Sequence, residues 1–272
     1  MNTKVVVITG AGSGLGRALA LAHARRGWTL ALSDRDAASA EAVLEEARGL
    51  GGEGMALACD VRSEAEFAAY AEAVSARYGG IDRLINNAGV GSAGSVQETD
   101  LTHWEWMLDI NVLGVVRGCR AFVPLLRSGG EMLNIASFAA IACAPGMAAY
   151  NAAKAAVVAI SESLRGELDE RGVHVAVACP EFFRSRICEG ARVSEPAQLQ
   201  VMRKLVERAR FSADDVAEDL LRALERRQFM IITQPHARWL YRLKRLAPNT
   251  FFTLLLGEIR RRTVRTAQRA RA

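Results

Sequence analysis

The sequence predicts an α/β fold in which one doubly wound parallel sheet of about seven strands carries helices on both faces. Short apolar runs rich in Val, Ile and Leu alternate with helical stretches from residue 5 to residue 233. Runs such as 5–9 and 173–179 are almost wholly apolar, as is typical of strands buried on both faces. The length of 272 residues, 50% of them hydrophobic, suits one such domain with an appendage.

The expected elements follow one another in strict alternation. Strands are expected at residues 5–9, 30–33, 55–58, 83–86, 131–136, 173–179 and 229–233. Helices are expected at residues 15–26, 37–50, 64–78, 104–121, 148–171 and 214–227. Residues 181–211 interrupt this pattern beyond the sixth strand, at the end of the sheet where such folds bind ligands. We therefore expect a catalytic domain over residues 1–234 with a lid at 181–211.

A glycine-rich turn, T-G-A-G-S-G-L-G at residues 9–16, joins the first strand to the first helix. Glycine permits a tight turn and lets backbone N–H groups approach a pyrophosphate, which the helix N-terminus also attracts. The position between a strand and a helix predicts dinucleotide binding. The expected contacts are Gly10, Ser13, Gly14, Leu15 and Gly16.

Asp34 ends the second strand, 18 residues beyond Gly16. A carboxylate there can accept hydrogen bonds from a ribose diol and would repel a 2′-phosphate, which favours NAD(H). Arg35 follows and could pair with a 2′-phosphate, so NADP(H) stays open. Asp34 could also cap the helix that begins near Ala37, a role compatible with ribose binding.

Three further polar positions lie near the ends of later elements. Asp60 and Val61 follow the third strand, where the carboxylate could contact an adenine amino group or cap the next helix. The N-N-A-G segment at residues 86–89 ends the fourth strand, and we expect Asn87, Ala88 and Gly89 to brace the sheet edge against the cofactor. Asn111 lies inside a helix, where asparagine is disfavoured, and this predicts a hydrogen-bonding role or a local kink.

Ser137, Tyr150 and Lys154 form the most informative group of the chain. Tyr150 follows Ser137 by 13 residues and precedes Lys154 by four, which places the phenol and the ammonium on one helix face. A free phenol has a pKa of about 10 and is a poor base at neutral pH. A neighbouring ammonium favours the phenolate, and a shift of about three units takes roughly 4 kcal/mol.

Together these motifs resemble the short-chain dehydrogenase/reductase superfamily, over about residues 3–233 and in the order and spacing usual for that family. The resemblance implies a Rossmann-type fold and an NAD(P)-dependent oxidoreductase. It implies that Tyr150 is the general acid/base and that Lys154 lowers the tyrosine pKa and holds the nicotinamide ribose. Ser137 would orient the substrate oxygen, and Asn111 would hold a water that links Lys154 to solvent.

The sequence departs from the family pattern after the sixth strand. The usual Pro-Gly turn reads Pro180-Glu181, and Ser185 stands where a threonine commonly meets the nicotinamide carboxamide. The resemblance places Pro180, Phe183 and Ser185 beside the cofactor. The changes put the loop geometry in question and leave the chemistry intact.

The substrate is expected to be an apolar secondary alcohol or its ketone. Phe182, Phe183, Ile187 and Met202 of the lid would supply an apolar lining. Phe138, Ala139, Ile141 and Met147, between the serine and the tyrosine, would extend it. A non-catalytic cofactor-sensing protein of the same fold is the alternative class, but such a protein is expected to lack a member of the Asn-Ser-Tyr-Lys set.

The C-terminal tail, residues 235–272, holds ten Lys or Arg residues and one acid, Glu258. The tail carries +9, which leaves −4 for the first 234 residues of a chain whose total is +5. We expect a helical segment that packs on the body or on a partner subunit, with an anionic membrane surface as the alternative. Nucleic acid is disfavoured because no recognition motif accompanies the basic residues.

Other residues predict the setting of the enzyme. Five scattered cysteines without a C-x-x-C pair favour a reducing cytoplasm, and the chain opens without a signal-peptide pattern. The dispersed histidines predict no metal site. Small residues at Ala152, Ala153, Ala155, Ala156 and Ala159 permit close helix packing, so a homodimer or homotetramer is expected. A membrane-binding tail would place the protein peripherally at the inner membrane surface.

Overall fold

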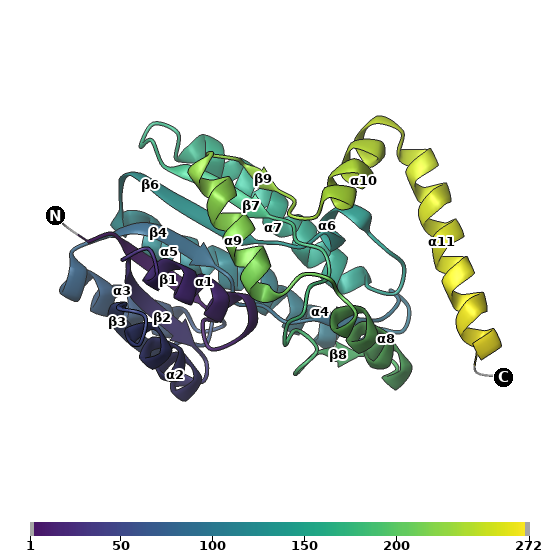
Figure 1. Cartoon of the computed structure of the whole chain (residues 1–272), viewed down its shortest axis with the longest axis horizontal. Helices are drawn as coiled ribbons and strands as arrows, with labels where there is room; N and C mark the ends of the chain where they lie inside the picture. Colours follow the sequence, from purple (N-terminus) through teal and green to yellow (C-terminus); the bar gives the residue numbers. More distant parts are fainter. Residues whose placement is uncertain (1–2, 270–272) are drawn as a thin grey trace. The chain divides into compact units, whose positions relative to one another are not determined.

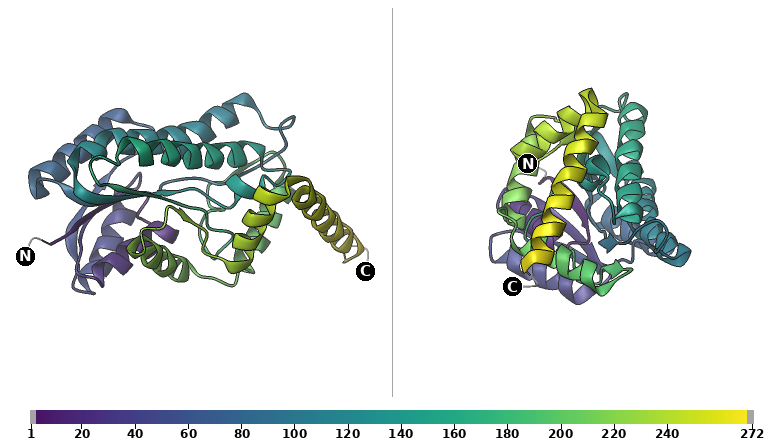
Figure 2. Two further views of the ribbon diagram at one scale, coloured as in Figure 1. Left: turned by 90° about the horizontal axis from the view of Figure 1, so that it is seen from above. Right: turned by 90° about the vertical axis from the view of Figure 1, so that its right-hand side faces the viewer.

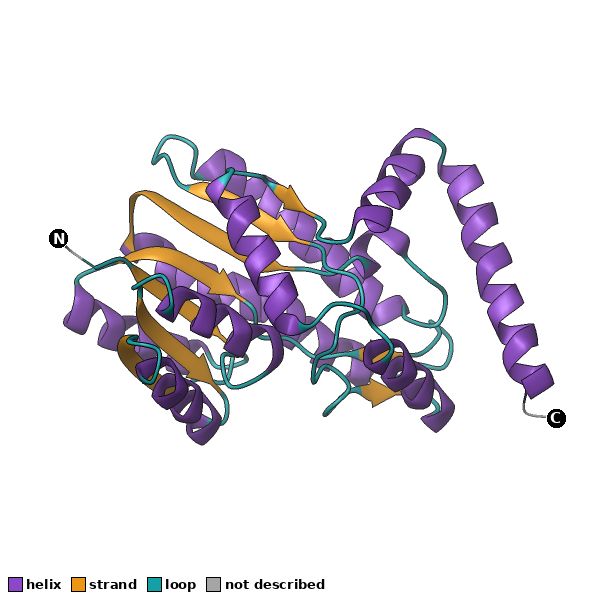
Figure 3. Cartoon of the chain, viewed as in Figure 1, coloured by secondary structure: helices purple, strands orange, loops and turns teal. Residues whose placement is uncertain are grey.

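The computed structural model describes residues 3–269, with side chains described as far as residue 261. Contacts within the chain divide it into two compact units, Met1–Thr233 and Gln234–Ala272. Figure 1 labels the elements of both units, and Figure 3 separates helices from strands.

The first unit is built on a parallel seven-stranded sheet in the order β3-β2-β1-β4-β6-β7-β9. Its strands are β1 (Val5–Thr9), β2 (Thr29–Asp34), β3 (Glu53–Ala58), β4 (Ile81–Asn86), β6 (Leu126–Ile135), β7 (His174–Ala178) and β9 (Met230–Ile231). The chain moves outward from β1 to β3 and then returns to β4 on the other side of β1. The carboxyl ends of β1 and β4 therefore border the switch point where doubly wound sheets bind ligands.

Helices cover both faces of this sheet (Figure 2). One face carries α1 (Gly14–Ala24), α2 (Ala37–Arg48) and α9 (Ala213–Glu225). The other carries α3 (Glu64–Tyr78), α4 (Leu101–Leu108), α5 (Gly114–Phe122) and α7 (Ala148–Glu167), with the short α6 (Ala139–Ala142) beside them. The fold class expected from the alternation of apolar runs and helical stretches is confirmed.

The main hydrophobic core lies between the sheet and the layer of α1, α2 and α9. Val6 and Ile8 of β1, Leu19 of α1 and Leu220 of α9 are all fully buried in it. Because both faces of β1 are covered, all five of its residues are buried, which accounts for the unbroken apolar run.

The structure differs from the expected elements in two places. The helix expected at 104–121 is divided by a π-helical turn, η1 (Asp109–Leu113), between α4 and α5. A second, two-stranded parallel sheet joins β5 (Ser92–Ala93) to β8 (Arg192–Val193), and α8 (Pro196–Glu207) follows within the expected lid. A 3-10 turn, η2 (Val123–Leu125), leads into β6.

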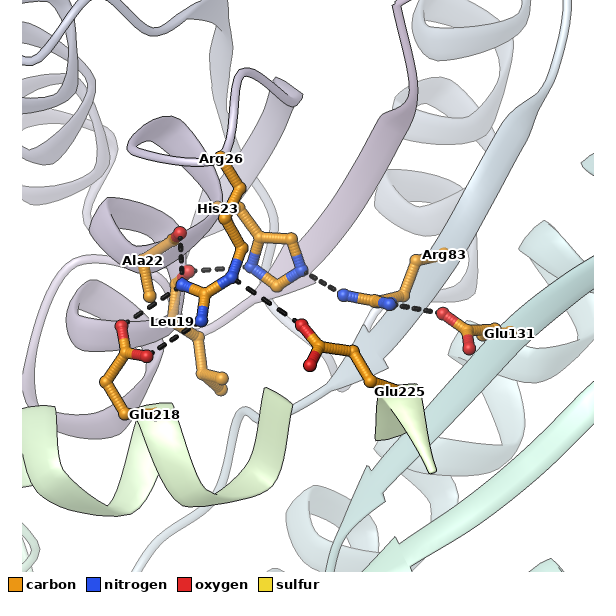
Figure 4. A network of polar contacts seen from close by, with 8 residues as sticks. All are labelled: Leu19, Ala22, His23, Arg26, Arg83, Glu131, Glu218 and Glu225. Atoms are coloured by element: carbon orange, nitrogen blue, oxygen red, sulfur yellow. Dashed lines mark hydrogen bonds and ion pairs between the residues drawn. The ribbon is translucent and has the colours of Figure 1, made fainter. Parts of the chain in front are cut away.

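A network of polar contacts surrounds the C-terminal end of α1 (Figure 4). The ring of His23 contacts the Leu19 carbonyl through Nδ1 at 2.7 Å and the Arg83 guanidinium through Nε2 at 2.7 Å. Arg83 also donates to Glu131 at 2.9 Å, and Arg26 binds Glu218 with two hydrogen bonds of 3.1 and 2.7 Å. The network connects α1, β4, β6 and α9.

These contacts fix the protonation of His23. The ring donates from Nδ1 to the carbonyl and accepts at Nε2 from Arg83, because a guanidinium has only donors. Burial, together with the charge of Arg83, lowers the pKa of His23 to about 3, so the ring is neutral at physiological pH.

The second unit holds two helices, α10 (Pro235–Leu246) and α11 (Pro248–Arg269). Lys244 of α10 lies over the rings of Phe251 and Phe252 of α11, 5.8 and 5.2 Å from their centroids. Proline at the first position of each helix fits the missing N–H donors there. Neither these helices nor any other in the described part of the chain is long and apolar enough to cross a membrane.

Candidate active site

The glycine-rich turn is shaped by close backbone approaches at the start of α1. Gly10 and Gly14 have φ values of 63° and 54°, in the left-handed region that glycine adopts without strain. A Cβ at Gly16 would lie 2.1 Å from the Gly10 carbonyl oxygen, and one at Gly10 would lie 2.7 Å from the Ala88 Cα. Ser13 is the N-cap residue, and its side chain makes no capping hydrogen bond. This leaves the first N–H groups of α1 facing the position expected for a pyrophosphate.

The N-N-A-G segment braces this turn, as expected. The Thr9 hydroxyl accepts hydrogen bonds from the backbone N–H of Asn87 at 3.1 Å and of Ala88 at 3.2 Å. The Asn87 amide donates to the carbonyls of Thr9 and Gly10, both at 2.9 Å. Thr9 was not among the predicted site residues, although its place at the head of the glycine-rich motif marks it.

Asp34 lies at the end of β2, against the glycine-rich turn. Its carboxylate accepts from the Gly12 N–H at 3.0 Å and from the Asp36 N–H at 3.2 Å. The alternative role of Asp34 as a helix cap is wrong, because Asp36 caps α2 by accepting from the Ala38 N–H at 3.1 Å. Arg35 is exposed beside Asp34. A carboxylate fixed next to the turn fits a ribose diol.

Asp60 and Val61 follow β3 on the same edge of the sheet. The Asp60 carboxylate accepts from the side chain and backbone of Arg62 at 3.0 Å, and these hydrogen bonds lower its pKa. It does not cap the following helix, because Ser63 does so by accepting from the Glu66 N–H at 3.2 Å. Val61 is buried against Gly114 of α5, where a Cβ would lie 3.1 Å away.

Asn111 lies at the centre of the π-helical turn and is fully buried. Its side-chain amide pairs with both backbone groups of Val90, accepting from the N–H and donating to the carbonyl, each at 2.9 Å. The expected hydrogen-bonding role is confirmed, and the π turn is the local irregularity. A Cβ at Gly89 would lie 2.8 Å from the Asn111 Oδ1 and 3.3 Å from the Lys154 Nζ, so Gly89 lies against both side chains.

Ser137, Tyr150 and Lys154 come together beyond the carboxyl end of β6. Ser137 follows this strand by two residues and accepts from the Ala139 N–H at 3.1 Å. Tyr150 and Lys154 lie on α7, with the ammonium 5.9 Å from the centre of the phenol ring. Lys154 is buried, and its Nζ donates to the Ile135 carbonyl at 2.9 Å.

The pKa of Tyr150 differs in direction from the expectation. Burial raises the pKa of the phenol, and only the hydrogen bond with Ser137 lowers it. Burial also lowers the pKa of Lys154 to about 8, so the ammonium keeps its proton at neutral pH. The chain on its own therefore keeps Tyr150 in the protonated form, the form required of a proton donor.

The segment after β7 crosses the glycine-rich turn. Pro180 is buried, and its carbonyl accepts from the Phe138 N–H at 2.8 Å. Phe183 packs against the main core, and Ser185 is half-buried. A Cβ at Gly14 would lie 3.9 Å from the Arg186 backbone nitrogen. Phe183 is therefore held by the core, and the backbone at Arg186 lies beside the glycine-rich turn.

Two short backbone pairings hold this lid, one near its start and one near its middle. Near its start, Arg184 forms a parallel bridge with Ser212. Further on, β8 pairs with β5. Between these points Gly91 lies against the lid, because a Cβ there would meet the Ile187 carbonyl oxygen at 2.9 Å and the Met202 side chain at 3.3 Å. Ile187 and Met202, two of the four lid residues expected to supply an apolar lining, thus lie against the loop after β4.

These residues fit a nicotinamide dinucleotide across the switch point. Glycines leave room at the turn, Asp34 lies beside it, and Lys154 and Tyr150 lie beyond β4 and β6. Within the described residues, no group of three or more His, Cys, Asp or Glu side chains is placed to hold a metal ion.

Comparison with known proteins identifies the family. A family model described as short chain dehydrogenase matches residues 4–195. SadH of Mycobacterium tuberculosis, named as an oxidoreductase, is 32% identical over 262 residues, which cover 94% of this chain and 95% of that protein. The fold and site define a doubly wound α/β protein with a glycine-rich turn at its switch point and Ser137, Tyr150 and Lys154 beyond β6. The chain belongs to the short-chain dehydrogenase/reductase family.

Other similar proteins differ from this chain in length or in the nucleotide bound. EphD of the same organism, also named as an oxidoreductase, is 34% identical over 255 residues, covering 90% of this chain but only 43% of that protein. A short-chain dehydrogenase/reductase from Burkholderia phymatum in complex with NAD has a TM-score of 0.83 and 32% identity, covering 90% of this chain and 93% of that one. A short-chain dehydrogenase from Sphingobium yanoikuyae in complex with NADPH has a TM-score of 0.73 and 31% identity, covering 87% and 91%. Similar proteins therefore bind either nucleotide.

Proposed function

We propose that this chain is an NAD(H)-dependent dehydrogenase that interconverts an apolar secondary alcohol and its ketone. The observation that carries the proposal is the convergence of Ser137, Tyr150 and Lys154 beyond β6, next to the turn that Asp34 borders. Residues 1–234 would form the catalytic domain, and residues 181–211 its lid.

Tyr150 would move the proton and Ser137 would orient the substrate. In oxidation, the phenolate oxygen of Tyr150 takes the hydroxyl proton while the carbinol C–H bond breaks and its electron pair leaves with the hydrogen as hydride. The bound nicotinamide cofactor supplies the hydride acceptor. Ser137 donates a hydrogen bond to the substrate oxygen and so orients it toward Tyr150. In reduction the same atoms move in reverse.

Lys154 and Asn111 would hold the site ready for this transfer. Lys154 would donate hydrogen bonds to the nicotinamide ribose and, as a buried cation, would stabilise the phenolate of Tyr150 while the proton is absent. The Asn111 side chain is committed to Val90, so its role would be to fix the loop that carries Gly89 beside Lys154.

Asp34 supports NAD(H) as the cofactor. Its carboxylate lies within hydrogen-bonding distance of the Gly12 N–H and would face the adenosine ribose, where a 2′-phosphate would be repelled. NADP(H)-linked carbonyl reduction is the second candidate, favoured by the exposed cation of Arg35. The B. phymatum and S. yanoikuyae structures show that similar proteins use each nucleotide.

The apolar substrate class rests on the wall between the serine and the tyrosine. Phe138 and Ile141 are buried there, and Met147 bridges to Gly94 of the loop after β4. The enzyme would act in the cytoplasm as a homodimer or homotetramer. These assignments rest on the chemistry of the residues and on the family.

Initial rates measured by the absorbance of the reduced cofactor test the proposal. Each cofactor is assayed with secondary alcohols and ketones of increasing chain length and ring size. A series of polyols serves as the polar comparison. We expect NAD(H) turnover that improves with apolar size. Faster turnover of polyols would overturn the substrate class, and a preference for NADP(H) would overturn the cofactor assignment.

The Tyr150→Phe variant tests the mechanism in the same assay. We expect turnover to fall by at least about a thousandfold, because the proton has no other carrier of matched position, while NADH binding followed by fluorescence stays nearly unchanged. Retained turnover in this variant is incompatible with the assigned role of Tyr150.

A further inference from the structure

The C-terminal unit exposes large apolar side chains on both of its helices. Trp239 and Leu246 of α10 are 57% and 87% exposed. Together with the half-buried Leu243 they occupy positions i, i+4 and i+7, which form a single stripe along the helix. On α11, Phe252, Leu254 and Leu256 are also exposed. Scattered exposed residues are ordinary, but a continuous stripe of this kind indicates a binding surface.

Cationic side chains lie next to this stripe. Arg238, Arg242 and Arg245 of α10 are exposed and occupy the neighbouring face at spacings of four and three. On α11, Arg260 and Arg261 are exposed as well. With ten basic residues against Glu258, residues 235–272 form a basic amphipathic segment.

The exposed stripe is distinct from the contacts between α10 and α11. Phe251 is buried, and Lys244 lies over its ring at 5.8 Å and over that of Phe252 at 5.2 Å. The rings of Phe251 and Phe252 also meet edge to face at 5.4 Å. Replacement of Trp239 or Leu246 should therefore leave the contact between the two helices in place.

We propose that α10 and α11 bind the surface of an anionic phospholipid bilayer. The arginines pair with headgroup phosphates while Trp239 and the exposed leucines enter the boundary between headgroups and acyl chains. A nucleic acid would satisfy the arginines but leave the apolar stripe in water. A second copy of the same segment would place like charges together. Of these three surfaces, an anionic lipid bilayer is the one that satisfies both features.

Vesicle co-sedimentation of the full chain tests this surface, independently of the proposed enzyme function. The probes are vesicles of phosphatidylcholine alone and of phosphatidylcholine with one-quarter phosphatidylglycerol. We expect sedimentation only with the anionic vesicles, weakening as salt is raised. Arg242→Gln with Arg245→Gln should lower the partition coefficient at least about tenfold, because each cation near such a surface contributes about fivefold. Trp239→Ser with Leu246→Ser should lower it comparably and abolish the binding that remains at high salt.

Matched controls come from the first unit. Arg25→Gln with Arg226→Gln removes two exposed arginines, and Leu50→Ser with Val96→Ser removes two exposed apolar side chains. Both should sediment like the parent, and far-ultraviolet circular dichroism checks that every variant is folded. A parent that stays in the supernatant with anionic vesicles would overturn the proposal, as would equal binding by the tail variants. Binding to polyuridylate without vesicle binding would assign the surface to nucleic acid. If no vesicle binding is seen and the tail variants have a lower molar mass than the parent in sedimentation velocity, the surface would be assigned to contact with a second copy.

Discussion

Backbone contacts hold the residues of the site before any ligand binds. Asn111 binds both backbone groups of Val90, and Lys154 donates to the carbonyl of Ile135. Thr9 holds the N–H groups that open the N-N-A-G segment. Each polar group is therefore fixed by a partner that mutation of a side chain cannot remove. A site fixed in this way loses little conformational entropy when substrate and cofactor arrive.

Replacement of Asp34 by alanine should shift the cofactor preference. The variant loses charge-assisted hydrogen bonds to the ribose diol and the repulsion of a 2′-phosphate. We expect the KM for NAD to rise about tenfold or more, with a smaller rise or a fall for NADP. Asp36→Ala is the matched control, because it removes a carboxylate two residues away. It should lower the stability slightly through the lost cap and leave the ratio of the two KM values unchanged. An equal effect of both variants on this ratio would contradict the role of Asp34.

For single residues, the sequence motifs predict which side chains lie together in the site but not which of them carry a proton. Gly10, Asn87 and Gly89 lie together because strand ends of one sheet edge converge. The pKa of Tyr150 could not be predicted, since it depends on the degree of burial, which spacing does not reveal. The alternative role of Asp34 as the cap of α2 stayed open for a similar reason, because Asp34 and Asp36 are both acceptable capping residues just before the helix.

The helices and strands whose apolar residues repeat at a regular spacing were predicted from the sequence. The elements without such a repeat were not predicted. The helix α3 occupies the expected residues 64–78, because Ser63 caps its start and Gly79, in the left-handed region, ends it. The strands β5 and β8 have two residues each, too few to show an alternation. Only Asn111 indicated an irregularity at the π turn, because the helical spacing of apolar residues continues through residues 109–113. The helix α8 lies in a segment that was expected only as a lid.

The His23 network makes the stability of the first unit depend on pH. Because the pKa of His23 is about 3 in the folded protein and about 6.5 when unfolded, the unfolded chain alone takes up this proton between those values. Stability should therefore fall by about 1.4 kcal/mol per unit as the pH drops below 6.5. A His23→Gln variant keeps a donor and an acceptor but cannot titrate.

Urea unfolding of both proteins from pH 7 to pH 5 measures this contribution. The carboxylates titrate alike in the two proteins, so the difference in unfolding free energy isolates His23. We expect that difference to change by about 2 kcal/mol over this range, in favour of the variant at low pH. A difference that stays constant with pH would show that the folded protein takes up the His23 proton over the same pH range as the unfolded chain.

For the whole molecule, α7 offers a surface suited to a second copy. Ala152 and Ala159 are exposed and Ala155 and Ala156 half-buried, at spacings that place all four on one face of the helix. Small side chains let two helices approach closely. We expect Ala152→Arg and Ala159→Arg to dissociate the oligomer, seen as a lower mass in sedimentation velocity. Ala69→Arg places the same charge on the exposed face of α3 and should leave the mass unchanged. A parent that is already monomeric would contradict the expectation.

The two tethers of the lid have a consequence for the order of events in each turnover. The bridge of Arg184 with Ser212 and the pairing of β5 with β8 hold the lid while Arg186 passes close to Gly14. A dinucleotide bound beneath this span would enter before the pairings form and leave after they open. We therefore expect sequential kinetics in which the nucleotide is first to arrive and last to depart. The rate-limiting step of turnover would then be the opening of two short backbone pairings. No covalent bond changes in that step.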